Sequence, residues 1–122
     1  MIAGATPPHI TVDDRVVVAA LPEEIDLANA RGITSMVSAA VPNDAVGLVL
    51  DLSGTTYLDS SGVHLIFDLA DRLHARQQTL VLAVPESSNV RRVLELVDVT
   101  VVAPMETDLA TAKESARSGR GS

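Results

Sequence analysis

Hydrophobic residues in this chain follow two spacings, one typical of strands and the other typical of helices. Short runs rich in Leu or β-branched residues predict strands at residues 9–12, 16–20, 46–52, 80–84 and 100–102. Three of these runs are apolar almost throughout, which is typical of strands that helices cover on both faces of a sheet. The pattern therefore predicts a sheet enclosed between layers of helix.

Between these runs, apolar residues recur at helical spacing and predict four helices. The clearest begins near Ser61 and carries small or apolar residues on one face, namely Gly62, Leu65, Ile66, Leu69, Ala70 and Leu73. An earlier helix is expected to begin at Asp26, a residue type that caps helices, and to end at Pro42. A third follows Ser87 or Ser88, and a fourth occupies about residues 106–116. This alternation indicates an α/β fold, and the polar tail 117–122 is expected to be disordered.

Composition narrows the class of protein. A length of 122 residues indicates a single domain, residues 1–122, with an ordered core over about 9–116. A net charge of −7 and only two aromatic residues, Tyr57 and Phe67, argue against nucleic acid as a partner. The absence of cysteine excludes disulfides and thiolate metal sites and agrees with a reducing compartment. The apolar runs are too short to span a membrane and residues 1–8 lack the features of a signal peptide, so we expect a cytoplasmic domain without membrane contact.

The chemistry of the chain concentrates in the turn that follows the strand at 46–52. Asp59, Ser60 and Ser61 are all residue types that cap helices, and Gly62 follows them. A helix N-terminus carries about half a positive charge and can accommodate a phosphate on one of these serines. Gly62 lacks a side chain, which would let another protein approach closely. The alternative is an ordinary strand-to-helix turn whose residues serve only to cap the helix. Composition alone favours this alternative, because such turns are common.

Three sequence blocks extend this interpretation. LPEEID at 21–26, LDLSGTTYLDSSG at 50–62 and SNVRRVLELV at 88–97 occur in this order. Together they resemble the STAS domain of bacterial anti-sigma-factor antagonists, over about residues 9–116. The resemblance implies a small mixed β-sheet of about five strands with about four packed α-helices.

The resemblance also implies a function. In that family a cognate anti-sigma factor, acting as an ATP-dependent serine kinase, phosphorylates a serine of the Asp-Ser-Ser-Gly turn. The unphosphorylated form binds the kinase and frees a sigma factor, so the family regulates transcription, as in stress responses, by partner switching. By position the phosphorylated residue is Ser60, with Ser61 as the second choice. The resemblance implies a phosphoprotein without a cofactor, as a monomer or weak dimer.

The expected partner-binding surface follows from the same blocks. Its residues are Glu24, Asp26, Asp59, Ser60, Ser61, Gly62, Val63 and Phe67. Two features depart from the family pattern. Glu23 stands where relatives typically have glycine, and Val63 and His64 follow Gly62 where relatives often have Leu and a small residue. Phe67 either widens the core of its helix or, if exposed, anchors a partner beside Ser60.

The alternatives to this function have weaker support in the sequence. A serine hydrolase built from Ser60 or Ser61 with His64 and Asp68 lacks a G-x-S-x-G elbow and an oxyanion-hole loop, so we expect no enzyme activity. The three histidines form no metal-binding pair, and the glycines form no nucleotide-binding pattern. A non-switching STAS scaffold in a signalling assembly or transporter system remains open, although a serine in the phosphoacceptor position favours the switch.

Overall fold

A five-stranded mixed sheet forms the centre of the computed structural model, which describes residues 7–119. Its strand order is β1-β2-β4-β6-β7. The strands are β1 (His9–Asp13), β2 (Val16–Ala20), β4 (Gly47–Asp51), β6 (Thr79–Ala83) and β7 (Met105–Glu106). β1 pairs with β2 in antiparallel fashion, whereas the other neighbours pair in parallel.

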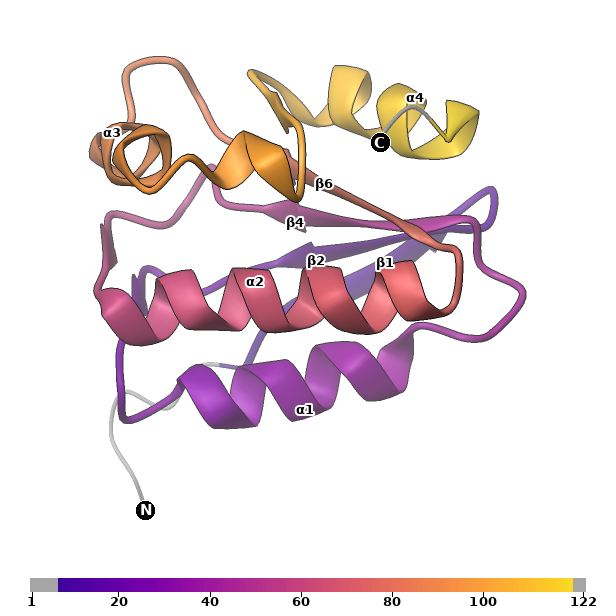
Figure 1. Ribbon diagram of the computed structural model, residues 1–122, viewed down its shortest axis with the longest axis horizontal. Helices are drawn as coiled ribbons and strands as arrows, with labels where there is room; N and C mark the ends of the chain where they lie inside the picture. The colour runs from indigo at the N-terminus through magenta and orange to yellow at the C-terminus, as the bar shows by residue number, and fades with distance from the viewer. Residues whose placement is uncertain (1–6, 120–122) are drawn as a thin grey trace.

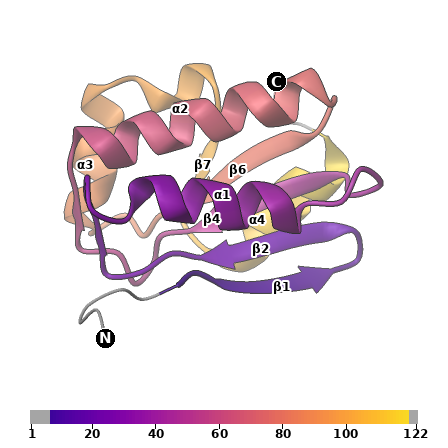
Figure 2. The same cartoon turned by 90° about the horizontal axis from the view of Figure 1, so that it is seen from below.

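Helices cover both faces of this sheet (Figure 1). Helices α1 (Ala30–Ala40) and α2 (Ser60–Ala75) lie side by side on one face, as Figure 2 also shows, and α4 (Leu109–Ser118) lies on the other. Helix α3 (Asn89–Leu96) and the 3-10 helix η1 (Val99–Val101) pack on the same core cluster as α1 and α2. The α/β fold with about five strands and four helices is therefore confirmed.

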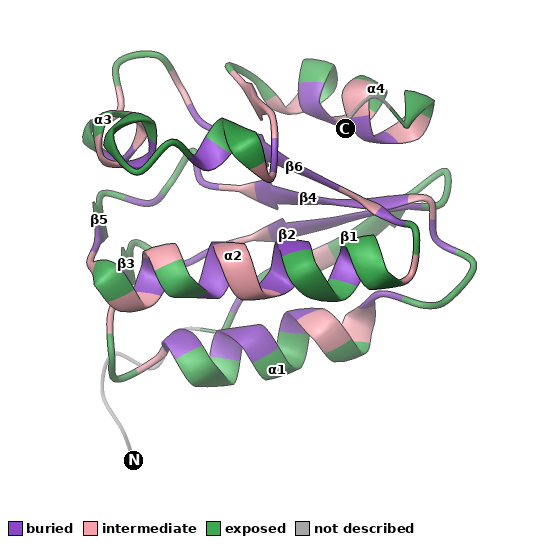
Figure 3. Ribbon diagram, viewed as in Figure 1, coloured by how far each residue is buried: buried purple, intermediate pink, exposed green. Residues whose placement is uncertain are grey.

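The continuous apolar runs arise because the central strands are buried on both faces. In β2, Val17 and Ala19 belong to the core cluster under α1 and α2, whereas Val16 and Val18 belong to the cluster under α4. The apolar face of α2 is buried against the sheet and its opposite face is exposed (Figure 3). At about 25 cal/mol per Å² of apolar surface, this burial is the main stabilising contribution to the fold.

A second, two-stranded sheet was not predicted from the sequence. β3 (Glu24–Ile25) pairs in parallel with β5 (Tyr57–Leu58), with Glu24 beside Tyr57 and Ile25 beside Leu58. Strands of two residues are too short to produce a hydrophobic alternation that a sequence pattern can reveal. This pair connects the loop before α1 to the loop before α2.

Two elements differ from the sequence prediction. Helix α1 begins at Ala30 and not at Asp26, because Asp26 Oδ1 accepts a hydrogen bond from the Ala28 amide and holds a turn there. The predicted strand at 100–102 is wrong: η1 occupies this region with Val101 exposed, and β7 is the fifth strand. A β-branched run on the surface resembles a short buried strand in sequence alone.

The end of the chain also differs from its prediction. Residues 117 and 118, expected in a disordered tail, belong to α4, and Gly119 caps that helix with a φ of +72°. Glycine adopts this left-handed conformation without a steric penalty. Residues 120–122 of the predicted tail lie outside the described residues. Across residues 7–119, the helices are too short or too polar to cross a membrane.

Candidate functional site at the start of helix α2

The segments 22–26 and 52–58 lie against each other and support the start of α2. Thr55 is buried, and its hydroxyl donates a hydrogen bond to the carbonyl oxygen of Pro22 over 2.9 Å. The amide of Thr56 donates to the carbonyl oxygen of Glu23 over 2.8 Å. Two of the three sequence blocks that resemble the family are therefore neighbours in space.

Asp59 is the N-cap of α2. Its Oδ1 accepts a hydrogen bond from the Ser61 amide over 2.8 Å, and its own amide donates to the carbonyl oxygen of Ile25 over 3.2 Å. An acidic N-cap satisfies an otherwise unpaired amide and complements the helix dipole. Because Asp59 takes the capping role, neither serine is needed for it.

Ser60 is the first residue of α2 and is exposed, whereas Ser61 is half-buried. Within the described part of the chain, the Ser60 hydroxyl makes no hydrogen bond that would hold it in place. Its oxygen therefore lies at the positive end of a helix, open to a second protein.

The absence of a side chain at Gly62 has a structural reason that the sequence did not indicate. A Cβ on this residue would lie 2.7 Å from Cγ of Leu58 and 3.2 Å from Cγ2 of Ile25. The position of the missing Cβ therefore points inward, toward the two short strands. Gly62 lets Ile25 and Leu58, both buried, pack directly against the first turn of α2.

Val63 and Phe67 are half-buried and pack against the main core cluster. Of the two alternatives for Phe67, the structure supports the one in which it widens the core. The strongly exposed apolar side chains near Ser60 are instead Leu27, with 82% of its surface accessible, and Tyr57, with 51%. Sequence reasoning missed both, because Tyr57 belongs to a two-residue strand and Leu27 to a turn, and neither falls in a helical period.

The acidic residues of the first block divide into two kinds. Glu23 and Glu24 are exposed, whereas Asp26 is half-buried and bonded to the local backbone. The Asp26 amide in turn donates to Oδ1 of Asn29 over 2.9 Å, and Nδ2 of Asn29 donates to the carbonyl oxygen of Glu24 over 2.8 Å. Asp26 thus shapes the loop, while the two glutamates add negative charge to its surface.

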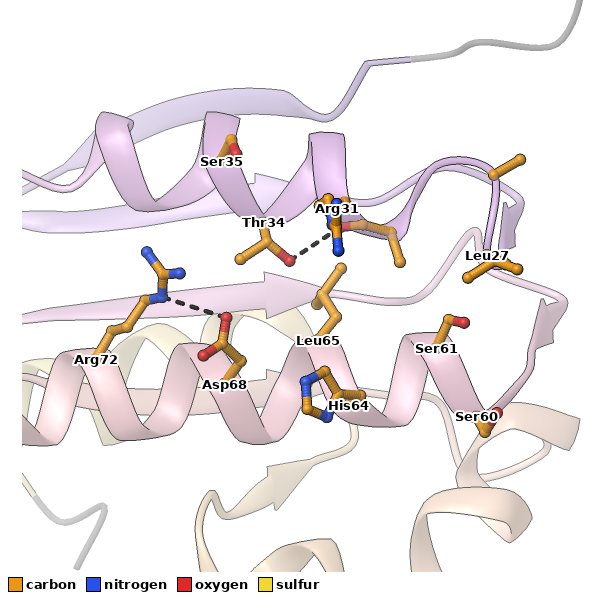
Figure 4. Close-up of a pocket in the computed structure, with 12 residues that line it drawn as sticks. Leu27, Arg31, Thr34, Ser35, Ser60, Ser61, His64, Leu65, Asp68 and Arg72 are labelled. Atoms are coloured by element: carbon orange, nitrogen blue, oxygen red, sulfur yellow. Dashed lines mark hydrogen bonds and ion pairs between the residues drawn. The ribbon is translucent and has the colours of Figure 1, made fainter.

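A groove of about 940 Å³ lies between the starts of α1 and α2 (Figure 4). Leu27, Arg31 and Thr34 line it from the α1 side, and Ser60, Ser61, His64, Leu65, Asp68 and Arg72 line it from α2. Asp68 and Arg72 form an ion pair across one helical turn, with Nε and Oδ2 3.2 Å apart. Both serines therefore open onto a polar groove that contains cationic groups.

The arrangement does not form a hydrolytic triad. Asp68 interacts with Arg72, and in residues 7–119 no hydrogen bond connects His64 with Ser60, Ser61 or Asp68. No group of three or more His, Asp or Glu side chains in the same residues is placed to hold a metal ion. The carboxyl groups with a clearly lowered pKa, Asp13 and Asp108, lie in other elements, beside Lys113 and Thr111 respectively.

Comparisons with known proteins identify the family and the fold. A family model of the STAS domain matches residues 7–112 of the chain. An anti-sigma factor antagonist from Mycobacterium paratuberculosis has a similar structure, with a TM-score of 0.77 and 24% identity over 96% of this chain and 99% of that one. No curated protein matches this chain.

Two structures of SpoIIAA are also similar. The anti-sigma factor antagonist SpoIIAA in its unphosphorylated form has a TM-score of 0.67 and 22% identity over 94% of this chain and 99% of that chain. The Bacillus cell fate determinant SpoIIAA in its phosphorylated form has a TM-score of 0.62 and 22% identity over 82% and 91%. At these identities the likeness establishes the fold.

Proposed function

This chain belongs to the STAS domain family, and on that premise we propose that it is an anti-sigma-factor antagonist controlled by phosphorylation of Ser60. Unphosphorylated, it binds an anti-sigma factor that has serine-kinase activity, and a sigma factor is released. Phosphorylation ends the binding. The protein thereby regulates transcription by partner switching in the cytoplasm, as in a stress response, and performs no chemistry of its own.

One observation carries this proposal: Ser60 is exposed at the first position of α2 while Asp59 supplies the cap. A kinase requires an accessible hydroxyl, and the fold must survive the added phosphate. The helix dipole favours a negative charge at this position by roughly 0.3 to 1 kcal/mol. Phosphorylation is therefore compatible with the folded domain.

The same phosphate is unfavourable for a docked partner. The surface around Ser60 includes the exposed side chains of Glu24, Leu27 and Tyr57, together with the first turn of α2. A partner that packs on this surface would have to desolvate a group carrying about −1.5 to −2 charges and make room for it. The complex should dissociate while the domain remains folded. That a structural relative, SpoIIAA, has been observed in both unphosphorylated and phosphorylated forms supports the proposal.

The switch is tested by binding and phosphorylation assays with candidate anti-sigma-factor kinases. Ser60→Asp should weaken binding at least tenfold, about 1.4 kcal/mol, with a nearly unchanged melting temperature. Ser60→Ala should bind and escape phosphorylation, as mass spectrometry after incubation with ATP would show. Ser118→Asp, which adds the same charge to an exposed serine on α4, is the matched control and should bind normally.

Two outcomes would contradict this assignment. Phosphorylation that persists in Ser60→Ala and disappears in Ser61→Ala would move the acceptor to Ser61. If neither variant changes binding or phosphorylation, the protein is a non-switching STAS scaffold.

A further inference from the structure

Arg31 places a positive charge beside the groove in an acidic protein. The chain has a net charge of −7, and most of its basic side chains are engaged: Arg72 with Asp68, Lys113 with Asp13, and Arg117 with Asp14. Arg15 and Arg76 donate to backbone carbonyl oxygens. Among the hydrogen bonds and ion pairs of residues 7–119, none involves Arg31, although it is exposed on the first turn of α1.

Arg31 also shares a groove with the candidate phosphorylation site. Ser60 and Ser61 line this groove from α2 and Arg31 lines it from α1 (Figure 4). Helices α1 and α2 lie side by side on the same face of the sheet (Figure 2). The two helices thus bring an arginine and an exposed serine, 29 positions apart in sequence, to one cavity.

We propose that Arg31 is the intramolecular counter-ion of phosphorylated Ser60, so that the phosphate occupies the groove between α1 and α2. This inference rests on the proposed function for the identity of the modified residue. A guanidinium group presents several N–H donors in a planar fork and matches the oxygens of a phosphate, and its flexible stem lets it reach across a groove. It would add a charge-assisted interaction between the two helices to the hydrogen bond that Nη1 of Arg72 donates to Oγ of Ser38 over 3.5 Å.

The other charged groups around the groove are less suited to this role. Arg72, the other arginine of the groove, is already paired with Asp68. Asp59 and Asp26 are anions and cannot serve as counter-ions of a phosphate, and each already accepts a hydrogen bond from a nearby backbone amide. Glu24 is acidic and would repel a phosphate, as would Asp68. His64 is the remaining groove residue that can carry a positive charge, and it lies on α2 itself.

The proposal adds a second consequence of phosphorylation. In the unmodified protein, Arg31 is presented to a partner beside Ser60. After modification, the phosphate fills part of the groove and neutralises this cation. A docked protein therefore loses a positive contact as well as meeting a new negative charge.

The test introduces phosphoserine at position 60 by amber suppression, so that it needs no kinase. Phosphorus NMR then follows the ionisation of the phosphate as a function of pH in four proteins: the parent, Arg31→Gln, Arg31→Lys and Arg92→Gln. Arg92 is an exposed arginine on α3 and serves as the matched control. An imidazole ordinarily titrates near the same pH as a phosphomonoester, so all four proteins carry His64→Gln.

A nearby cation favours the dianion and lowers the pKa of a phosphate. We expect Arg31→Gln to raise the phosphate pKa by roughly 0.2 to 0.7 unit, the size of an exposed ion pair. Arg31→Lys should retain part of the lowering, and Arg92→Gln should leave the phosphate pKa unchanged. Equal phosphate pKa values in the Arg31→Gln and Arg92→Gln proteins would overturn the proposal. Because the phosphate is installed directly, that result would leave the proposed switch intact, whereas a kinase that ignores Ser60 would refute the switch and not this contact.

Discussion

Gly62 occupies the first turn of α2 with its α-carbon against two side chains from the short strands. The close approach of Leu58 and Ile25 leaves no room for a methyl group. The residue that sequence reasoning assigned to partner access is thus a packing residue. Ser60, two positions earlier, is by contrast exposed to solvent.

Gly62→Ala should destabilise the domain by about 1 to 3 kcal/mol, because overpacking forces Leu58 and its strand to shift. Equilibrium unfolding in urea would measure the loss. Gly32→Ala is the matched control, since Gly32 lies on α1 with no atom near its absent Cβ. That change should stabilise the helix by roughly 0.5 to 1 kcal/mol. Equal effects of the two substitutions would contradict the inward orientation of Gly62.

At the scale of the element, one side of α2 packs on the sheet and another side lines the groove. Its buried face carries Leu65, Leu69 and Leu73, which are at most 1% exposed, and this face holds the helix on the sheet. Its N-terminal turn and outer side contribute Ser60, His64 and Asp68 to the groove. A rigidly seated helix keeps Ser60, the proposed phosphorylation site, in a fixed position relative to α1.

Substitutions along α2 should distinguish these two faces by their effect on the free energy of unfolding. Leu65→Ala or Leu69→Ala should cost about 2 to 5 kcal/mol of unfolding free energy, because each leaves a cavity in the core. Asp71→Ala, on the exposed side, should change stability by no more than about 0.5 kcal/mol. Chemical denaturation of the three variants measures the contrast. Small, equal changes at all three positions would mean that the helix is rotated relative to the structure described here.

At the scale of the whole molecule, ion pairs join the first hairpin to the last helix. Nζ of Lys113 on α4 lies 2.9 Å from Oδ2 of Asp13, and Nε of Arg117 lies 3.1 Å from Oδ2 of Asp14. The hydrogen bond from Lys113 and then its charge hold the pKa of Asp13 below its ordinary value. These contacts lie across the sheet from the groove, and the first connects residues 100 positions apart.

The lowered pKa of Asp13 predicts a direction for the pH dependence of stability. A carboxyl group whose pKa is lower in the folded state stabilises the fold above its unfolded pKa, and this contribution disappears as the pH falls through the folded pKa. Lys113→Met should therefore raise the pKa of Asp13 toward its ordinary value, as carboxyl-carbon NMR would show. It should also reduce the difference in stability between pH 7 and pH 3. An unchanged Asp13 pKa in Lys113→Met would contradict the assigned cause.

The local pattern of hydrophobic and polar residues was sufficient to predict much of the architecture. Apolar strands and the helical face from Gly62 to Leu73 were predictable, because burial on a regular element imposes a period on the sequence. The capping residue types at Asp59, Ser60 and Ser61 likewise mark the start of α2 in the sequence alone. These features depend on neighbours within a few residues of each other in the chain.

Other features were decided only by the tertiary structure. Three of them depend on which distant segments of the chain meet. They are the β3–β5 pair, the inward orientation of Gly62, and the exposure of Leu27 and Tyr57. The run at 100–102, in which Thr100 and Val101 are exposed, was mistaken for a strand for the same reason, since nothing in its composition shows whether another element covers it. The groove that brings Arg31 to Ser60 exists because α1 and α2 pack on one face of the sheet. A sequence period reports only that a residue is buried or exposed on its own element, whereas a site between two elements is set by the free energy of packing them together.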